Sequence, residues 1–484
     1  MEELTERVAS SDARLRAAGL DAPLHEVRLD ALRGVDDDVF DAIARFAGRA
    51  IVCCRPSRQG GNFVEGEGQR LELLRRAARR NVRLVDVEED VGAEVIGELG
   101  VVIAKRADLT PEEAPRGLLV SLHDLTGFPP DLEARLARMR TLGGAALKLA
   151  VTVRDAAELG RLLDLRRTFT EPAVLLGMGP AGRLSRTHYP AFGSPFTFVA
   201  ASAERATAPG QLSLDEALEL GMPATSARPL CALVGGERMT GSPGPRVYNR
   251  LFRAQGRTMS YVPVLTHDLR QALTVLNRVG AIGLSVTMPH KLAALEFARA
   301  DATAHEVGAA NSLRLRDGWE ATNTDVAGIA VPLARAIAAR PLRRAVILGA
   351  GGAARAAVVA SRQLGLEVTV CARNVEAARA LVGGGGHARP WRDRGEEGPL
   401  TEAVLVNATP VHGDESPWPA ERTLDAAVVF DTALGSPSSR LLTSARRAGA
   451  LVVTPLDMWF AQGATQMSWI LDEHVDPRML EELA

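Results

Sequence analysis

Two lysines are the first candidates for chemistry in this sequence, because the chain otherwise uses arginine for its basic residues. Lysine and arginine together number 57, and the lysines are Lys105, Lys148 and Lys291. Arginine cannot release its proton or form an imine, whereas a lysine with a lowered pKa can do both. Lys148 and Lys291 each follow an apolar run, so we interpret both as catalytic candidates and Lys105 as a surface residue.

Polar residues near Lys148 suit one kind of reaction. His123 and Asp124 end the apolar run that comes before the one carrying Lys148, and Arg55 ends an earlier run. Arginines can hold a carboxylate and depress the pKa of a lysine, and a histidine can move a proton. Together these residues predict imine chemistry on an anionic keto acid. Taken alone, a histidine beside an aspartate is also typical of a structural hydrogen bond.

Lys291 belongs to a different pattern. A β-branched run, 283–287, leads into a proline turn that ends at Lys291, and Asp325 closes the later segment Thr322–Asp325. A lysine beside an aspartate can pass the proton of a secondary alcohol while a hydride leaves the alcohol carbon, and the aspartate orients the ammonium group. Loops that contain Asn and Asp are equally typical of turns, so each segment alone also has a structural interpretation.

The elements that position Lys148 alternate between strand and helix in the first part of the chain. This alternation predicts an α/β fold with a parallel sheet, and a (β/α)8 barrel is the expected architecture, with function at the C-terminal strand ends. Amphipathic helices are expected at Gln69–Arg80 and Pro130–Leu142. The expected strands are Leu24–Leu29, Ala50–Cys54, Val82–Val87, Leu118–Leu122, Ala146–Val151, Ala173–Met178 and Thr197–Ala201.

A second α/β unit is expected after a small, polar, proline-bearing linker at Met222–Pro229. It carries Lys291 and Asp325. Its expected strands are Leu230–Val234, Ser260–Val264 and Ile282–Thr287, and its expected helices are Pro245–Gln255 and Asp268–Val279.

A glycine-rich turn marks a third, nucleotide-binding unit. Gly349, Gly351, Gly352 and Ala354 lie between an apolar strand and a helix, where glycines let the backbone approach a pyrophosphate at the helix N-terminus. A second strand, Glu367–Cys371, is followed by Arg373 rather than by an acidic residue. Arg373, helped by Arg355, therefore favours the 2′-phosphate of NADP. Further strands are expected at Val404–Ala408 and Val428–Asp431.

Length and composition limit the remaining classes. A chain of 484 residues predicts about three domains, and a net charge of −2 gives no electrostatic reason to expect nucleic acid or a membrane as partner. The four cysteines show no ligand spacing for zinc, so no metal is expected. No apolar run approaches 18 residues and the first residues are not those of a signal peptide, so a cytoplasmic protein is expected.

The first part of the chain resembles type I 3-dehydroquinate dehydratase from about residue 12 to residue 221. The resemblance implies that Lys148 forms a Schiff base with the substrate ketone and that His123 is the general acid and base. It also implies that Arg186 binds the carboxylate while Glu26, Arg28, Arg55 and Gln211 position the substrate. The motifs are Glu26-Val-Arg28-Leu-Asp30, Arg55-x4-Gly60-Gly61, Asp86-Val-Glu88, Ser121-Leu-His123-Asp124, Lys148-Leu-Ala150, Met178-Gly179-x2-Gly182-x2-Ser185-Arg186 and Ala208-Pro-Gly-Gln211.

Two features depart from that family. Gln59 stands before the Gly-Gly pair where the family usually has a glutamate, and an amide cannot transfer a proton. The first strand of the family's barrel is also missing, because only a helical segment, Ser11–Ala18, precedes Leu24. The barrel is therefore expected to be completed in an unusual way.

The later part of the chain resembles shikimate dehydrogenase. The motifs are Val286-Thr287-x-Pro289-x-Lys291, Gly308-Ala-Ala-Asn311-Ser312, Thr322-Asn323-Thr324-Asp325-x2-Gly328, Asn407-Ala-Thr409-Pro410 and Met458-x3-Gln462. The resemblance implies that Lys291 and Asp325 transfer the proton, and that Thr287, Asn311 and Gln462 bind ring hydroxyls. It assigns Ser242 to the substrate carboxylate, and Asn407, Thr409 and Met458 to the cofactor side. Two substrate-side residues of the family are lost, a serine at Gly244 and a tyrosine at Leu434.

The two resemblances together predict two successive enzymes of aromatic amino-acid biosynthesis in the order of the plant-type fusion. The expected domains are a barrel at 1–222, a substrate domain at 229–335, a Rossmann NADP-binding domain at 336–455 and a returning helical segment at 456–484. Two alternatives stay open. The second half could act on quinate, or the chain could be a non-catalytic metabolite sensor, for which the lost residues and the missing strand would speak.

Overall fold

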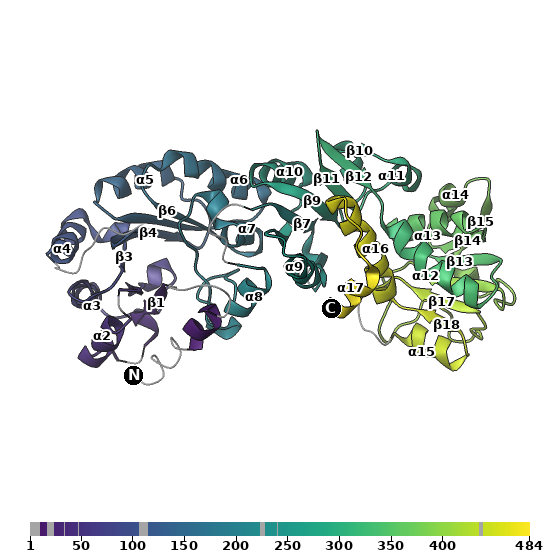
Figure 1. The fold of residues 1–484 in the computed structure, drawn as a ribbon, viewed down its shortest axis with the longest axis horizontal. Helices are drawn as coiled ribbons and strands as arrows, with labels where there is room; N and C mark the ends of the chain where they lie inside the picture. The colour runs from purple at the N-terminus through teal and green to yellow at the C-terminus, as the bar shows by residue number, and fades with distance from the viewer. Residues whose placement is uncertain are drawn as a thin grey trace. The chain divides into compact units, whose positions relative to one another are not determined.

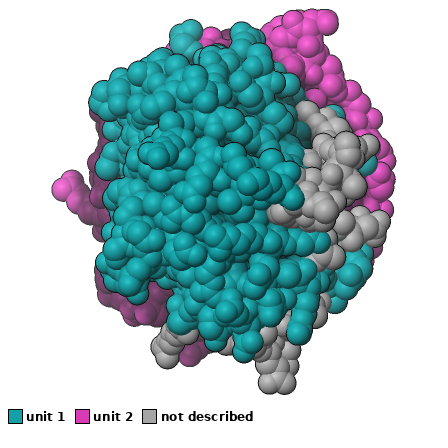
Figure 2. Space-filling model, turned by 90° about the vertical axis from the view of Figure 1, so that its left-hand side faces the viewer, with its two compact units in different colours: residues 1–230, 258–280 teal, residues 231–257, 281–484 magenta. Residues whose placement is uncertain are grey.

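The fold is described from a computed structural model that covers residues 10–16, 24–32, 34–46, 48–105, 115–222, 228–239, 241–434 and 439–484. The linker predicted at Met222–Pro229 therefore lies mostly outside the described residues. The chain forms two compact units, residues 1–230 with 258–280 and residues 231–257 with 281–484, which Figure 2 colours separately. Within the described residues, no helix is long and apolar enough to cross a membrane.

The first sheet is a half-barrel of six parallel strands in the order β1-β2-β3-β4-β5-β6 (Figure 1). Its strands are β1 His25–Arg28, β2 Ala50–Cys53, β3 Leu84–Glu88, β4 Gly117–Asp124, β5 Ala146–Thr152 and β6 Ala173–Met178. Helices α2 Asp37–Ala44, α3 Glu67–Ala78, α4 Ala93–Ala104, α5 Leu132–Thr141, α6 Ala156–Leu165, α7 Arg183–Thr187 and α8 Leu214–Glu219 belong to the same part of the chain. The expected α/β class and strand–helix alternation are confirmed.

The parallel register brings the polar strand ends together. Ser121 of β4 pairs with Lys148 of β5, and Cys53 of β2 pairs with Asp86 of β3. Because parallel strands present their carboxyl ends at one edge of a sheet, side chains from neighbouring strands reach a common space there. The predicted site residues of the first half are positioned by this edge.

One predicted strand is wrong. Residues 197–201 do not form a strand, and Ala200 makes only an isolated bridge with Ser213. The side chains of Phe196 and Phe198 instead pack against the apolar residues of the half-barrel. β-branched and aromatic residues favour a strand only where a ladder partner is present, and β1 has β2 as its one partner in the described sheet.

The segment before β1 is helical, as predicted, over the described residues 10–16. Asp12 is buried and accepts hydrogen bonds from Arg49 at 3.0 and 2.8 Å, and it lies 2.7 Å from the His25 ring at the start of β1. Arg14 forms an ion pair with Asp215 of α8. The described residues before β1 thus form a helix held by ion pairs, and not the strand with which the family's barrel begins.

The second sheet carries the predicted substrate-domain residues, and its order is β10-β12-β11-β9-β7-β8. Its strands are β7 Leu230–Gly235, β8 Ser260–Leu265, β9 Ala281–Val286, β10 Arg299–Ala300, β11 Ser312–Leu315 and β12 Trp319–Thr322. The associated helices are α9 Gly244–Ala254, α10 Leu269–Arg278, α11 Ala302–Val307 and α12 Asp325–Ala339. Strand β11 runs antiparallel to both β9 and β12.

The third sheet is the expected Rossmann-like layer, fully parallel in the order β15-β14-β13-β16-β17-β18. Its strands are β13 Arg344–Leu348, β14 Glu367–Ala372, β15 Gly386–Pro390, β16 Ala403–Asn407, β17 Val428–Asp431 and β18 Leu451–Val453. Helices α13 Gly352–Gln363, α14 Val375–Val382, α15 Arg440–Arg447, α16 Pro455–Leu471 and α17 Pro477–Leu483 follow its strands. The strand order reverses between β13 and β16, which is where such sheets bind ligands.

Candidate active sites

One cavity at the carboxyl edge of the half-barrel holds every residue predicted for the first reaction. A lysine, a histidine, three arginines, a carboxylate and two amides line it together with apolar side chains such as Phe198. The predicted residues among the lining are Glu26, Arg28, Arg55, His123, Lys148, Arg186 and Gln211.

Lys148, the predicted imine-forming residue, is one of the side chains that line this cavity. Its side chain is 4% exposed, and its Nζ donates a hydrogen bond of 2.7 Å to Asp86 Oδ2 and lies 3.7 Å from Glu26 Oε1. The Phe198 ring centroid is 4.3 Å from Nζ. The amine is therefore fixed between two carboxylates and an aromatic face, in a space largely shielded from water.

Asp86 ties the lysine to Arg55. Arg55 donates to Asp86 at 2.8 Å, to Glu88 at 2.9 Å and to Ser121 at 3.0 Å, and Ser121 donates to the other Asp86 oxygen at 2.5 Å. Burial acts to raise the pKa of Asp86, but the Arg55 and Lys148 charges outweigh it and hold that pKa far below its usual range. Asp86 is therefore an anion that orients both cations.

His123 lies at the end of β4 beside the lysine. Its Nδ1 is 2.8 Å from Arg55 Nη1. Burial, together with the Arg55 and Lys148 charges, lowers the pKa of His123 well below its usual value. These surroundings therefore disfavour the positively charged form of the imidazole.

Arg186, on α7, is a buried guanidinium whose described hydrogen bonds and ion pairs include no carboxylate, although the Glu26 charge acts on it from a distance. It donates to the Gly177 carbonyl at 3.1 Å and is 2% exposed, and burial with the nearby Arg183 charge lowers its pKa to about 10. A buried cation is costly unless an anion compensates it. This geometry suits the carboxylate of a bound substrate, the role that the family resemblance implies for Arg186.

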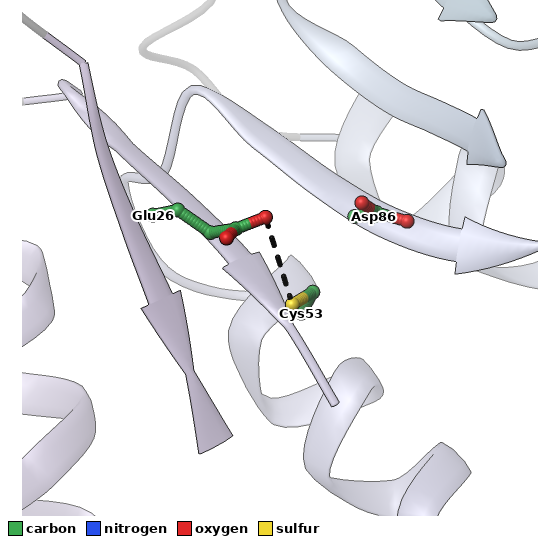
Figure 3. Close-up of side chains that lie close together, drawn as sticks. All are labelled: Glu26, Cys53 and Asp86. Carbon is green, nitrogen blue, oxygen red and sulfur yellow. Dashed lines mark hydrogen bonds between the residues drawn. The ribbon is translucent and has the colours of Figure 1, made fainter. Parts of the chain in front are cut away.

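Three side chains near Lys148 have the chemistry of metal ligands. Glu26, Cys53 and Asp86 lie within 4.8 Å of one another, and Figure 3 shows the Cys53 thiol next to the Glu26 carboxylate. The Lys148 ammonium already lies 2.7 Å from Asp86 and 3.7 Å from Glu26. A metal cation would have to displace that ammonium, and burial also raises the pKa of the Cys53 thiol. The cluster is therefore better matched to an ammonium than to a metal.

The second site is built around Lys291 and Asp325. Lys291 follows β9, Asp325 begins α12, and Nζ donates to Asp325 Oδ2 at 2.5 Å. Lys291 is 23% exposed at its side chain and Asp325 is 9% exposed. The pair is thus partly open to a ligand while the carboxylate stays fixed.

Asn311 and Gln462 extend this pair into a hydrogen-bonded network. Asn311 Nδ2 donates to Asp325 at 2.8 Å and lies 3.3 Å from Gln462 Oε1. Helix α16, which carries Gln462, packs along α12 (Figure 1). Gly328 allows the close approach, because a Cβ at this position would lie 2.6 Å from Gln462 Cβ.

The remaining predicted residues follow neighbouring strand ends. Thr287 N–H donates to Val234 at the end of β7, which places the turn after β9 beside the loop after β7. That loop carries Ser242, whose hydroxyl accepts from Gly244 N–H at 3.3 Å at the start of α9. Leu434, which stands where the family has a tyrosine, follows β17 and is 52% exposed.

The glycine turn after β13 has the form expected for a dinucleotide site. Gly349 has φ +113°, and a Cβ there would lie 2.8 Å from the Ala408 carbonyl. A Cβ at Gly351 or Gly352 would meet nothing within 4 Å, so a pyrophosphate has open access to the start of α13. Arg355 lies in that helix, and Arg373 is exposed after β14. The donors present fit a phosphorylated dinucleotide.

Asn407 acts within the protein. Its side chain is fully buried, donates to the Val411 carbonyl and to Asp431, and accepts from the N–H and the hydroxyl of Thr409. It therefore fixes the turn that follows β16 beside the glycine turn. Ala354 and Met458 are buried in the core between the sheet and its helices.

Comparisons with known proteins cover both halves of the chain. Residues 4–221 match the family model of type I 3-dehydroquinase, and residues 234–313 match that of the shikimate dehydrogenase substrate binding domain. A "Shikimate dehydrogenase (NADP(+))" from Anaeromyxobacter dehalogenans is 39% identical over 48% of this chain and 87% of its own length. The later half of the chain belongs to the shikimate dehydrogenase family.

One further relative covers most of this chain, and one solved structure covers about half of it. A chloroplastic bifunctional 3-dehydroquinate dehydratase/shikimate dehydrogenase of Arabidopsis thaliana is 28% identical over 93% of this chain and 78% of its own length. A solved shikimate 5-dehydrogenase from Thermus thermophilus, in complex with NADP(H) and shikimate, is 31% identical over 53% of this chain and 98% of its own, with a TM-score of 0.46.

Several residues of both sites have roles that were not predicted. In the dehydroquinase half, Asp86 and Ser121 hold Arg55 and Lys148 in place. In the shikimate dehydrogenase half, the buried Gln466 donates to Ser312 at 2.6 Å and accepts from Ser285 at 2.5 Å. Asp86 and Ser121 stood in the motifs Asp86-Val-Glu88 and Ser121-Leu-His123-Asp124, but the sequence assigned no role to either residue. Gln466, by contrast, is one helical turn from Gln462, and that spacing was an available signal.

Proposed function

We propose that this chain catalyses two successive reactions, the dehydration of 3-dehydroquinate to 3-dehydroshikimate and the reduction of that product to shikimate. The observation that carries the proposal is the pairing of each lysine with a group that fits the chemistry. Lys148 shares one cavity with His123 and the buried Arg186, and Lys291 lies 2.5 Å from Asp325. The substrates are small carboxylates.

The first reaction uses the amine of Lys148. The amine adds to the substrate ketone and water leaves, which forms an imine and makes the neighbouring C–H bond more acidic. His123 takes the proton from that carbon and returns it to the departing hydroxyl, so the second product is water. Hydrolysis of the imine restores Lys148. Arg186 holds the carboxylate, and Asp86 keeps Lys148 and Arg55 in register throughout.

The second reaction uses the Lys291 and Asp325 pair. NADPH, when bound, supplies the hydride for the ketone carbon. Lys291 gives a proton to the ketone oxygen, and Asp325 orients the ammonium group and stabilises its charge. Asn311 and Gln462 bind ring hydroxyls beside this pair. Ser242 binds the substrate carboxylate and Thr287 binds a ring hydroxyl, on the side where the loops after β7 and β9 meet.

NADP is the proposed cofactor. The open backbone at Gly351 and Gly352 receives the pyrophosphate, and Arg373 with Arg355 provides the positive charge for a 2′-phosphate. An acidic residue after β14 would repel that phosphate, and Arg373 stands there instead. Asn407 and Thr409 shape the facing turn.

Borohydride trapping tests the first half of the proposal. Treatment with 3-dehydroquinate and borohydride should add the mass of the reduced ligand to the peptide that contains Lys148. Lys148→Arg should abolish both the label and the dehydration while the reduction of 3-dehydroshikimate continues, because Lys291 lies in the other compact unit. A label on another residue, or an active parent without label, would refute the role of Lys148.

Gly244 favours a second substrate for the later half. At this position, at the start of α9, the family's second carboxylate-binding serine is replaced by glycine, while Ser242 remains. The loss of one hydroxyl leaves room beside the ring carbon that bears the carboxylate. Quinate has a hydroxyl and a tetrahedral centre at that carbon, whereas shikimate does not. Oxidation of quinate is therefore the alternative activity, and comparison of both alcohols with NADP decides between them.

A further inference from the structure

Arg70 is a buried arginine of the dehydroquinase half that does not line the cavity of the first site. It belongs to α3, and its side chain is 0% exposed. A charged side chain is almost never fully buried unless it is paired, because an unpaired buried charge is costly. The contacts of Arg70 therefore show which groups its charge holds in place.

The Arg70 guanidinium binds three groups at once. Its Nε and Nη2 donate to the two oxygens of Glu67 at 3.0 and 2.7 Å. Its Nη1 donates to Glu88 Oε2 at 2.5 Å and to the Cys54 carbonyl at 2.9 Å. The planar fork of an arginine matches this arrangement, whereas a lysine ammonium is a single point charge. Glu67 thus orients Arg70, and Arg70 holds Glu88 and the chain at Cys54.

Both groups held by Nη1 determine where Arg55 lies. Cys54 is the residue before Arg55 in the chain. Glu88 accepts from Arg55 with Oε1 at 2.9 Å, while its other oxygen accepts from Arg70. Arg55 reaches the cavity from there, and its Nη1 lies 2.8 Å from His123 Nδ1. Arg70 is therefore connected to Arg55 at two points, through the preceding residue of the chain and through a shared carboxylate.

We propose that Arg70 is a positioning residue of the dehydratase site that fixes the guanidinium of Arg55. It acts through the Glu88 carboxylate and the Cys54 carbonyl. The inference rests on the proposed dehydratase function, in which Arg55 positions the substrate. The described contacts of Arg70 do not include the imine-forming lysine or the catalytic histidine, so its effect on the reaction passes through Arg55.

The charge of Arg70 also acts on the titration of Glu88. Burial raises the pKa of Glu88, and the charges of Arg55 and Arg70 work against that rise. Asp86 on β3 acts in the same direction as burial. The Cys54 thiol stays neutral, because burial raises its pKa to about 12. Without Arg70 the pKa of Glu88 would rise further, and a protonated Glu88 would hold Arg55 less firmly.

Dehydratase kinetics of Arg70→Met across pH distinguish positioning from packing. Methionine keeps much of the side-chain length but removes the charge and the donors. We expect kcat/KM to fall about tenfold or more at about pH 6, and to recover toward the parent value as the pH rises through the raised pKa of Glu88. Lost packing alone would lower kcat/KM by the same factor at every pH, and that result would overturn the proposal.

Three further variants sharpen this test. In the Glu88→Gln background, Arg70→Met should lower kcat/KM by one factor at every pH, because the titrating group is gone. Arg70→Lys keeps the charge but not the fork, so we expect a smaller loss without added pH dependence. Arg75→Met is the matched control and should keep the parent kcat/KM, because Arg75 lies on the same helix but donates to Glu98 at 2.9 Å.

Two outcomes of these variants would also overturn the proposal. One is a pH-dependent effect of Arg70→Met that persists in the Glu88→Gln background. The other is parental kcat/KM of Arg70→Lys at every pH, which would show that the two-point contact is not needed. Arg70→Lys keeps the proposal testable if Arg70→Met does not fold. Reduction of 3-dehydroshikimate should be the same in all variants and reports that the second unit is intact.

Unfolding in urea gives a readout that needs no activity. A pKa that is raised in the folded state stabilises the fold below the unfolded pKa, and this stabilisation is lost as the pH rises through the folded pKa. The loss of stability in Arg70→Met, followed by far-UV circular dichroism, should therefore grow with rising pH. A loss that is independent of pH would overturn the inference while the dehydratase function stands. A parent without dehydratase activity would overturn the function, and the unfolding curves would still decide the role of Arg70.

Discussion

Lys291 and Asp325 are 34 residues apart in the sequence, yet the Lys291 Nζ lies 2.5 Å from Asp325 Oδ2. The strand that ends before Lys291 and the helix that begins at Asp325 create this contact. We expect Asp325→Asn to lower kcat for shikimate oxidation about 10²- to 10⁴-fold, because a neutral amide orients the ammonium group less well and does not stabilise its charge. KM should change little, which steady-state kinetics with NADP will show.

Asn311→Ala provides the comparison for that variant. It removes a donor to Asp325 and a predicted contact with the ring hydroxyls, so it should raise KM as well as lower kcat. Equal effects of both variants on KM alone would contradict the assignment of proton transfer to the Lys291 and Asp325 pair.

Arg373→Ala tests the choice of cofactor. The exposed Arg373 follows β14, and the loss of one charge-assisted contact with the 2′-phosphate should weaken NADP binding by about 1.5–3 kcal/mol. NAD binding should be spared, because NAD lacks that phosphate. Titration of both cofactors against parent and variant gives the measurement. Equal affinity of the parent for NAD and NADP would refute the preference.

Gly244→Ser restores the hydroxyl that the family has at this position. It should strengthen shikimate binding by about 0.5–1.5 kcal/mol, the value of one neutral hydrogen bond, and lower the KM for shikimate. Tolerance of quinate should fall, because the serine occupies the space that its extra hydroxyl needs. If the serine leaves both the shikimate KM and the quinate/shikimate ratio unchanged, Gly244 does not control the substrate.

Asp12 should make the stability of the first unit depend on pH. Its hydrogen bond with Arg49 lowers the pKa of Asp12 to about 2, against the counteracting effect of burial, with the His25 hydrogen bond contributing in the same direction. A pKa that is lower in the folded state stabilises the fold above the unfolded pKa of about 4, and this stabilisation is lost as the pH falls toward 2. Asp12→Asn should therefore cost about 1–2 kcal/mol at pH 7 and progressively less below pH 4.

The tryptophans allow that effect to be assigned to one unit. All five lie in the second unit, at Trp319, Trp391, Trp418, Trp459 and Trp469. Urea unfolding followed by loss of dehydratase activity should shift in Asp12→Asn, whereas the tryptophan fluorescence transition should stay where it is. A pH-independent difference between parent and variant would show that the Asp12 carboxylate charge does not hold the helix.

The sequence predicted the parts of the fold that depend on local pattern. The strands that carry Lys148 and Lys291 were recognised from apolar runs, and the glycine turn from its spacing between a strand and a helix. Residues 197–201 were predicted as a strand because their composition favours one. A ladder also needs a partner strand, and composition does not reveal whether that partner is present.

The candidate site was predictable where single residue types are distinctive. Lysine is rare in this chain, so Lys148 and Lys291 were visible, and the family resemblance supplied their partners. The roles of Asp86 and Gln466 were missed because they depend on contacts between residues far apart in the sequence. Asp86 meets Lys148 across 62 positions, and Gln466 meets Ser285 across 181. Such partners become evident only when the sheets are assembled.

A coupled assay from 3-dehydroquinate tests the central claim, that one chain carries both activities. The absorbance of the enone product and the oxidation of NADPH are followed in the same sample. We predict that the enone appears before NADPH is added, and that NADPH is then consumed in a 1:1 ratio with the enone as shikimate forms. Failure of the enone to appear, or an enone that persists in the presence of NADPH, would contradict the account.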